Sequence, residues 1–206
     1  MASFISFEGG EGTGKSTQCT LLAARLKAMG APHLLTREPG GSPGAEAVRE
    51  LLVRGAQDRW SADAEALLMY AARFDHVERV IAPALAAGSN VICDRFADST
   101  RAYQGAGGAG AGLIEALEAA MRPRCWPDLT LIFDLDPVIG LARAADRASA
   151  ETRFEDKGLA FHQRLRAAYL AIARAEPTRC LMIDAGGTPE VVEAAVWDAV
   201  EARLTR

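Results

Sequence analysis

Residues 9–16 have the sequence Gly-Gly-Glu-Gly-Thr-Gly-Lys-Ser, and no other segment constrains the fold of this chain as strongly. The segment matches the pattern G-x-x-x-x-G-K-[ST], in which a glycine-rich turn joins a strand to a helix and its backbone N–H groups surround phosphate oxygens. Aromatic and β-branched residues at 3–7 precede it, as a strand requires. Apolar residues at helical spacing follow it: Cys19, Leu22, Leu26 and Met29. A nucleoside triphosphate is therefore the expected ligand.

The residue types in this loop suit the chemistry of a bound triphosphate. Glycines let the backbone approach the phosphate oxygens closely. Lys15 supplies a mobile cation for the outer phosphates, and Ser16 supplies a hydroxyl ligand for the Mg²⁺ ion that accompanies ATP. The residues predicted to bind ATP are Gly9, Gly10, Glu11, Gly12, Thr13, Gly14, Lys15, Ser16 and Thr17.

Composition argues against several other classes of protein. A formal net charge of −4 disfavours a general nucleic-acid-binding surface, so we expect small anionic ligands and no nucleic acid. The four cysteines include no C-x-x-C pair, which is typical of reduced, buried thiols rather than of a disulfide or zinc framework. No apolar run reaches the roughly 18 residues of a membrane span, and the first strand begins too early to leave room for a signal peptide. We expect a cytoplasmic protein with no membrane partner.

Strand-like and helix-like segments alternate along the whole chain. Further strand-like runs occupy 33–36, 90–94, 128–134 and 179–184. Helical patterns occupy 45–54, 62–87 with Pro83 near its end, 137–147, 155–175 and a last helix that opens at Thr188 and Pro189, and a Gly/Ala-rich connector is predicted at 105–112. The alternation predicts an α/β three-layer P-loop fold with a five-stranded parallel sheet flanked by helices, as a single domain over 1–206.

Ligands of such sheets bind beyond the carboxyl ends of the strands. This rule brings the phosphate loop together with Arg37, Asp94 and Arg95, each at or just after the end of a predicted strand. Guanidinium groups match phosphate geometry, so Arg37 and Arg95 are predicted to hold an acceptor monophosphate. Asp94 is predicted to orient Mg²⁺ through water or to bind Arg95, the alternative being a carboxylate that only caps the loop.

Five short segments in this order resemble bacterial thymidylate kinases (dTMP kinases), and the resemblance covers nearly the whole chain. The segments are 7–16, 36–41 (Thr-Arg-Glu-Pro-Gly-Gly), 70–73 (Tyr-Ala-Ala-Arg), 94–105 (Asp-Arg-Phe, Asp-Ser-Thr and Ala-Tyr-Gln-Gly) and 127–131 (Pro-Asp-Leu-Thr-Leu). The resemblance implies transfer of the γ-phosphoryl group of ATP to dTMP with Mg²⁺, giving dTDP and ADP. It also implies a homodimer.

The resemblance further implies which residues bind dTMP. Glu11 approaches the 3′-hydroxyl, Arg73 contacts the thymine base, and Tyr103 lies against the deoxyribose. Met69 stands where the family often has an aromatic residue stacked on the base; it shares a helix face with Arg73, and the alternative is a core methionine. The full predicted set is Glu11, Arg37, Met69, Arg73, Arg95, Ser99, Thr100, Tyr103 and Gln104.

Residues 143–155 change from apolar periodicity to small, polar and charged residues, and we interpret them as a lid. A closing lid expels water and delivers a cation to the transferring phosphoryl group. Family members place the catalytic arginine either in the phosphate loop or in the lid, and this loop has Gly12 at that position. Arg147 is the predicted cation, with Arg143 and Arg153 as supporters; Lys15 and Arg95 complete the predicted catalytic set.

Two other functions remain compatible with the phosphate loop. One is a kinase of a different nucleoside monophosphate or of a deoxynucleoside. The other is a phosphate-loop module that hydrolyses or senses ATP without a small acceptor. His33, His76 and His162 show no ligand-like spacing and are predicted to be structural or surface residues.

Overall fold

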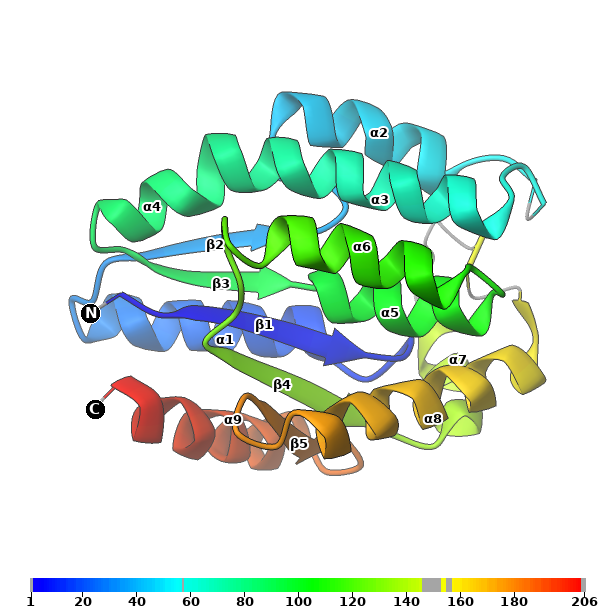
Figure 1. Ribbon diagram of the computed structural model, residues 1–206. Helices are drawn as coiled ribbons and strands as arrows, with labels where there is room; N and C mark the ends of the chain where they lie inside the picture. The colour runs from blue at the N-terminus through cyan, green and yellow to red at the C-terminus, as the bar shows by residue number, and fades with distance from the viewer. Residues whose placement is uncertain (1, 57, 146–152, 155–156, 205–206) are drawn as a thin grey trace.

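The computed structural model describes residues 2–56, 58–145, 153–154 and 157–204. Its core is a parallel sheet of five strands in the order β2-β3-β1-β4-β5, which confirms the predicted sheet (Figure 1). The strands are β1 (Phe4–Gly9), β2 (His33–Arg37), β3 (Asn90–Asp94), β4 (Leu129–Asp134) and β5 (Cys180–Asp184). All five carboxyl ends therefore meet at one edge of the sheet, on the right in Figure 1.

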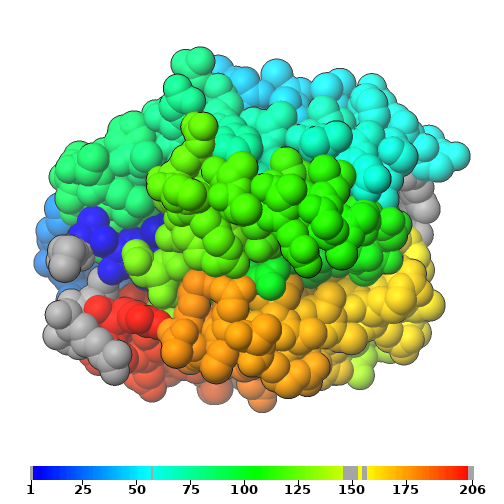
Figure 2. All heavy atoms as spheres, in the orientation of Figure 1, coloured from blue at the N-terminus to red at the C-terminus, as the bar shows by residue number. Residues whose placement is uncertain are grey.

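Helices cover both faces of the sheet. On one face lie α1 (Lys15–Ala28) and α9 (Pro189–Leu204), which pack on the apolar cluster that contains Ile5, Phe7 and Ile183. The other face is covered by α3 (Ala62–His76), α4 (Ala82–Ala86), α5 (Ala97–Ala106), α6 (Ala111–Met121) and α8 (Leu159–Ala175). Figure 2 shows α3, α6 and α8 forming most of the surface on this side. Two further helices, α2 (Pro43–Val53) and α7 (Pro137–Ala145), pack on α3 and α8, respectively.

The central strand β1 is buried along its entire length. Ile5 and Phe7 point toward α1 and α9, and Phe4 belongs to the cluster on the opposite face, because successive side chains of a strand alternate between faces. Burial on both faces explains the nearly continuous apolar character of the strands. Ser6 and Glu8 share the face of Phe4 and are fully buried, so the chain places polar groups beneath α5 and α8.

Serine residues begin two of the helices that flank the carboxyl edge. The Ser42 hydroxyl accepts a hydrogen bond from Ala45 N, and Pro43 occupies the first position of α2. The Ser61 hydroxyl accepts one from Ala64 N at the start of α3. Both caps satisfy backbone donors that a helix N-terminus leaves open.

Three predicted elements differ in extent from those observed. The segment predicted as a connector over 105–112 contains the end of α5 and the start of α6, because its alanines continue the helices on either side. The helix predicted over 62–87 is divided by a π-helical turn, Val77–Ile81, one turn before Pro83, whose ring nitrogen cannot donate to the helix ladder. The helix predicted from 155 begins at Leu159, after Gly158 with φ 76°. Within the described ranges, no helix combines the length and apolar character that crossing a bilayer requires.

Candidate active site

The carboxyl edge of the sheet borders a cleft of about 430 Å³ between the phosphate loop, the end of β2, α3 and α5. The fold brings most of the predicted site residues to this cleft although they are far apart in sequence. Those that line it are Glu11, Gly12, Thr13, Gly14, Lys15, Ser16, Arg37, Met69, Arg73, Asp94, Arg95, Ser99, Thr100, Tyr103 and Gln104.

The phosphate loop holds its lysine in a folded-back position. Lys15 Nζ donates to Gly10 O at 2.6 Å and to Thr13 Oγ1 at 3.1 Å. Gly12 and Gly14 have φ values of 68° and 85°, which favour glycine. Burial, together with the nearby Arg95 guanidinium, lowers the pKa of Lys15 to about 8 despite neighbouring carboxylates. An anion in this loop would pair with the ammonium group and favour its charged form.

Gly12 also lies against the backbone of α7. A Cβ atom at Gly12 would lie 1.9 Å from Gly140 O, and a Cβ atom at Gly140 would lie 2.5 Å from Glu11 O. Neither position can accept a side chain without displacement of the backbone. The loop therefore has no room for an arginine at position 12.

Arg95 connects β3 to α5 and is the centre of the polar contacts in the cleft. Its Nη2 donates to Glu11 Oε1 at 3.0 Å and to Tyr103 Oη at 3.1 Å, while Nη1 donates to Gly9 O at 3.0 Å. The Tyr103 hydroxyl donates to the same Glu11 oxygen at 2.5 Å. Burial alone would raise the pKa of Glu11, but Arg95 and Lys15 outweigh it and lower that pKa to about 2. The guanidinium is thus fixed beside the phosphate loop.

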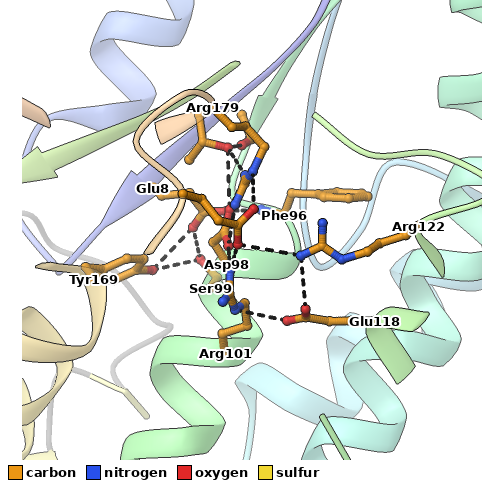
Figure 3. Close-up of polar contacts among 12 residues, drawn as sticks. Glu8, Phe96, Asp98, Ser99, Arg101, Glu118, Arg122, Tyr169 and Arg179 are labelled. Atoms are coloured by element: carbon orange, nitrogen blue, oxygen red, sulfur yellow. Dashed lines mark hydrogen bonds and ion pairs between the residues drawn. The ribbon is translucent and has the colours of Figure 1, made fainter. Parts of the chain in front are cut away.

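A second group of polar residues surrounds the Glu8 carboxylate (Figure 3) and contacts Arg95 Nη1 through Ser99 and Tyr169. Ser99 Oγ donates to Glu8 Oε2 at 2.5 Å and is 3.0 Å from the Tyr169 hydroxyl, which is 3.3 Å from the same carboxylate oxygen. Sequence reasoning predicted Ser99 as a dTMP contact but assigned no role to Glu8 or Tyr169. Glu8 could have been selected from the sequence, because it is a charged residue inside an apolar strand. Nothing in the sequence indicated a role for Tyr169, because its hydrogen-bond partners are 70 and 161 residues away.

Arg73 is 2% exposed and contacts three different segments. Its Nε donates to Glu38 Oε2 at 2.8 Å, and Nη2 donates to Phe96 O at 3.0 Å and Thr100 Oγ1 at 3.1 Å. Nη1 is buried and has no hydrogen-bond partner among the described residues. Because buried donors are nearly always paired, this nitrogen, in a residue that lines the cleft, is available to an acceptor atom on a bound molecule.

Residues that sequence reasoning did not select hold Arg73 in place. The Glu38 carboxylate accepts from both Arg73 and His76 Nδ1, the latter at 3.1 Å, and His76 Nε2 is 2.8 Å from Thr36 Oγ1. His76 is fully buried, which agrees with its predicted structural role. The sequence spacing of these residues gave no indication of their contact, because it depends on the pairing of β2 with the rest of the sheet.

Arg37 and Asp94 lie at the ends of neighbouring strands. Arg37 Nη2 pairs with Glu46 at 3.2 Å, and both side chains are about half exposed, so the pair holds the guanidinium only weakly. Ser16 Oγ donates to Asp94 Oδ2 in a short hydrogen bond. Asp94 thus contacts the loop hydroxyl, which corresponds to the metal-site prediction more closely than to direct pairing with Arg95.

The predicted Mg²⁺ ligands suit that ion. A hydroxyl and a carboxylate oxygen are adjacent, and Mg²⁺ in phosphoryl-transfer sites takes one or two protein oxygens plus water and phosphate oxygens. Among the described residues, no group of three or more His, Cys, Asp or Glu side chains is arranged to hold a metal ion. Ser16 and Asp94 would hold the ion together with phosphate oxygens of a bound nucleotide.

Of the three arginines predicted in the lid, Arg143 and Arg153 belong to the described residues, and Arg147 lies outside them. Arg143 is exposed and donates to Ala185 O at 3.0 Å, and it does not line the cleft. Arg153 is 4% exposed; its Nη1 contacts Leu52 O at 2.9 Å and Glu65 at 2.5 Å. These contacts join Arg153, within the segment predicted as a lid, to α2 and α3, which favours a structural role for this residue.

The two weaker predicted acceptor contacts, Thr100 and Gln104, are buried on α5. Gln104 Nε2 donates to Glu65 Oε1 at 2.7 Å, so this amide nitrogen is already paired. The Thr100 hydroxyl accepts from Arg73 and thereby contributes to the position of that guanidinium. Met69, one turn before Arg73, is half-buried and lines the cleft, so it is not a core residue.

Comparisons with known proteins agree with this geometry. A family model described as thymidylate kinase matches residues 7–196. The chain is 65% identical over 202 residues to a thymidylate kinase of Caulobacter vibrioides, covering 98% of this chain and 97% of the relative, and 55% identical over 204 residues to one of Bradyrhizobium diazoefficiens, covering 98% and 90%. A crystal structure of thymidylate kinase from Ehrlichia chaffeensis, 32% identical, has a TM-score of 0.78 over 97% of this chain and 98% of that one.

Proposed function

The chain belongs to the thymidylate kinase family, and from this membership we propose which of its residues carry out each part of phosphoryl transfer. The enzyme transfers the γ-phosphoryl group of ATP to dTMP and so forms dTDP and ADP. Family membership decides against both alternatives considered from the sequence, a kinase of another acceptor and a module without an acceptor.

We propose that dTMP occupies the 430 Å³ cleft with its base toward Arg73 and Met69. The buried, unpartnered Arg73 Nη1 supports this orientation most directly, because a carbonyl oxygen of the base would satisfy it. Tyr103 and Glu11 then border the deoxyribose. Arg95, with Arg37 on the other side of the cleft, holds the monophosphate.

The remaining proposed contacts of dTMP are made from α5. Ser99 and Thr100 are adjacent in this helix, Gln104 lies one turn further on, and all three line the cleft. Each already has a hydrogen bond within the protein: Ser99 donates to Glu8, Thr100 accepts from Arg73, and Gln104 donates to Glu65. We propose that they shape the pocket chiefly by fixing their partners.

On the donor side we propose that residues 9–17 bind the phosphates of ATP, with Lys15 moving from Gly10 O to the outer phosphates. Ser16 and Asp94 would hold Mg²⁺ beside them. When bound, the ion supplies positive charge to the phosphate oxygens between which the phosphoryl group moves. No general base is required, because the attacking phosphate oxygen is already anionic near neutral pH.

Turnover of different acceptors tests the proposed pocket. ADP release is measured in a coupled assay with dTMP, dUMP, UMP, CMP or thymidine as acceptor. We expect the highest rate with dTMP, because Arg73 and Tyr103 recognise the base and the deoxyribose and Arg95 requires a phosphate. Fastest turnover of CMP or thymidine, or ATP consumption that dTMP does not increase, would contradict the proposal.

We propose that Arg147 in the lid supplies the cation that stabilises charge on the transferring phosphoryl group. Arg147→Ala is expected to lower kcat by about a thousandfold and to leave the KM for dTMP nearly unchanged, because an arginine finger acts mainly in the transition state. Steady-state kinetics of Arg147→Ala and, for comparison, of Arg143→Ala measure this; the second variant is expected to lose much less, because Arg143 does not line the cleft. A near-normal kcat for Arg147→Ala would transfer the role to Arg143 or Arg153.

We further propose a cytoplasmic homodimer. The four cysteines are buried and unbridged, which suits a reducing compartment. The outer surfaces of α3 and α6 carry exposed apolar side chains that could bury one another in a twofold contact: Leu67, Ala71, Ala116, Ala119 and Ala120. Light scattering of the purified protein measures the mass, and a monomer at micromolar concentration would contradict the dimer.

A further inference from the structure

Arg95 has a backbone conformation that an arginine rarely adopts. Its φ is 72°, and among the described residues no other non-glycine residue has a positive φ. Such a conformation costs of the order of a kilocalorie per mole or more and persists only where surrounding contacts enforce it. The contacts that enforce it determine where the acceptor-binding guanidinium points.

One oxygen of the buried Glu8 carboxylate contacts the backbone beside this conformation. Glu8 Oε1 accepts a hydrogen bond from Phe96 N at 2.7 Å, directly after Arg95. Arg95 N, before this conformation, donates to Phe7 O at 2.9 Å, and Cys93 Sγ donates at 3.0 Å to Arg95 O, which belongs to the same peptide group as Phe96 N. The end of β1 thus holds the turn through two consecutive residues.

The other oxygen of Glu8 organises hydroxyl groups around the Arg95 side chain. The Ser99 and Tyr169 hydroxyls both donate to Glu8 Oε2, so their oxygen lone pairs are left to accept from Arg95 Nη1, at 3.3 and 3.5 Å. Figure 3 shows Glu8, Ser99 and Tyr169 converging from β1, α5 and α8. A single carboxylate therefore contacts partners that hold both the backbone and the guanidinium of Arg95.

Stability alone does not explain a carboxylate at this position. Glu8 is fully buried in the central strand, where an apolar side chain would avoid the cost of burying charge. Burial, together with the nearby Asp98, raises the pKa of Glu8 to about 7, against the opposing effects of Ser99, Arg95 and Phe96 N. Residues that break local packing rules in this way are expected at functional sites.

We propose that Glu8, acting through Ser99, Tyr169 and the Phe96 amide, is a positioning residue that fixes Arg95 for the acceptor phosphate. This inference rests on the role of Arg95 in the proposed function. Tyr169 belongs to α8, the helix that follows the lid segment, so the acceptor arginine also contacts the element to which the lid is joined.

Glu8→Gln tests the proposal with little change of shape. The amide still offers an oxygen to Phe96 N, but its NH₂ group opposes the two hydroxyls that previously donated to the carboxylate. We expect the KM for dTMP to rise about 10- to 100-fold, the effect of disrupting hydrogen bonds to charged groups, while kcat and the KM for ATP change less than about threefold. Tyr169→Phe, which keeps the ring, is expected to raise the KM for dTMP about threefold.

A double-mutant cycle separates positioning from a general effect on folding. If Glu8 acts through Arg95, adding Glu8→Gln to Arg95→Ala should leave the KM for dTMP within about twofold of that of Arg95→Ala alone. Ser6→Ala is the matched control, since Ser6 is equally buried on the same face of β1 but contacts Thr130 instead of the Arg95 cluster. It should leave both KM values unchanged.

The possible results separate this inference from the proposed function beneath it. If Arg95→Ala leaves the KM for dTMP unchanged, the role of Arg95 itself is wrong. If Arg95→Ala raises that KM and folded Glu8→Gln does not, or if the two effects multiply in the double variant, the positioning role of Glu8 is wrong. If Glu8→Gln does not fold, Tyr169→Phe decides, and an unchanged KM for dTMP overturns the proposal.

Discussion

Two sides of the first turns of α5 can be compared, because ion pairs between arginines and carboxylates lie on both but only one side borders the cleft. One side faces the cleft, where Arg95 pairs with Glu11 beside an open volume. The other side contains Asp98, which pairs with Arg179 at 2.6 Å and with Arg101 at 2.9 Å (Figure 3). Both sides consist of arginines and carboxylates within hydrogen-bond distance.

The difference lies in what each cluster leaves unsatisfied. The residues Asp98, Arg101, Glu176 and Arg179 form the cluster on the side away from the cleft, which we call the rear cluster. Glu176 accepts from both Arg101 and Arg179, at 2.5 and 2.9 Å, and Thr130 accepts a further hydrogen bond from Arg179. The charges of these four residues therefore satisfy one another. In the cleft the Nη1 of Arg73 has no hydrogen-bond partner in the described part of the chain, and the charges border a cavity of about 430 Å³. Burial and ion pairing therefore do not identify a binding site by themselves; an open donor beside a cavity does.

The sharpest test of this comparison removes the cation of the rear cluster. Arg179→Met leaves Asp98, which is 1% exposed, with a buried charge and fewer partners, and we expect a loss of about 3–5 kcal/mol in the free energy of unfolding. Urea denaturation measures the loss. The KM for dTMP should change less than about threefold in the folded variant. A loss below about 1 kcal/mol would show that the rear cluster does not hold α5.

The pH dependence of the free energy of unfolding compares Glu11, on the cleft side of α5, with Glu176, on the opposite side. The pKa of Glu11 is about 2 in the folded protein and near 4.5 when unfolded, so its charge stabilises the fold above pH 4.5 and this contribution, about 3 kcal/mol, is lost as the pH falls toward 2. Hydrogen bonds from Arg179 and Arg101 outweigh the effect of burial and lower the pKa of Glu176 to about 2 as well.

Urea denaturation between pH 5 and pH 2 distinguishes the two carboxylates. Glu11→Gln should flatten the pH dependence more than Glu176→Gln, because Glu176 lies closer to solvent and its pairs are more strongly screened. Equal flattening would show that the cleft is no more shielded from solvent than the rear of α5.

The smallest expected effect comes from a substitution that keeps the charge in the cleft. Arg73→Lys retains a cation for Glu38 but removes Nη1, the nitrogen for which the described residues provide no hydrogen-bond partner. We expect the KM for dTMP to rise about tenfold and the KM for ATP to stay unchanged, because a lysine cannot reproduce the guanidinium fork. Steady-state kinetics measure both constants. An unchanged KM for dTMP would remove Arg73 from the base-binding site.

Much of the fold could be predicted because local patterns agree with it. The five strands were found from buried apolar runs, and the parallel order of strand, loop and helix follows from the alternation. The helix α6 was missed because Gly107, Gly108 and Gly110 precede it and its own sequence is rich in alanine. Gly/Ala-rich segments do not show whether the chain turns or continues as a helix.

Residues that line the cleft could be predicted where they lie in short recognisable segments, and not where their positions depend on long-range contacts. The phosphate loop and Arg95 follow strands, and Arg73 belongs to the short segment 70–73 in the last turns of α3. Glu8, Glu38, His76 and Tyr169 act through partners 35 or more residues away, and no spacing in the sequence records such contacts. A charged run likewise does not tell a solvated lid arginine from a buried anchor such as Arg153.

The close approach of Gly12 to Gly140 also limits how this enzyme could be redesigned. An arginine grafted into the phosphate loop would displace the first turns of α7, the helix that leads into the lid. Placing a guanidinium at position 12 would therefore require a compensating shift of α7, and a substitution in the loop alone would not achieve it.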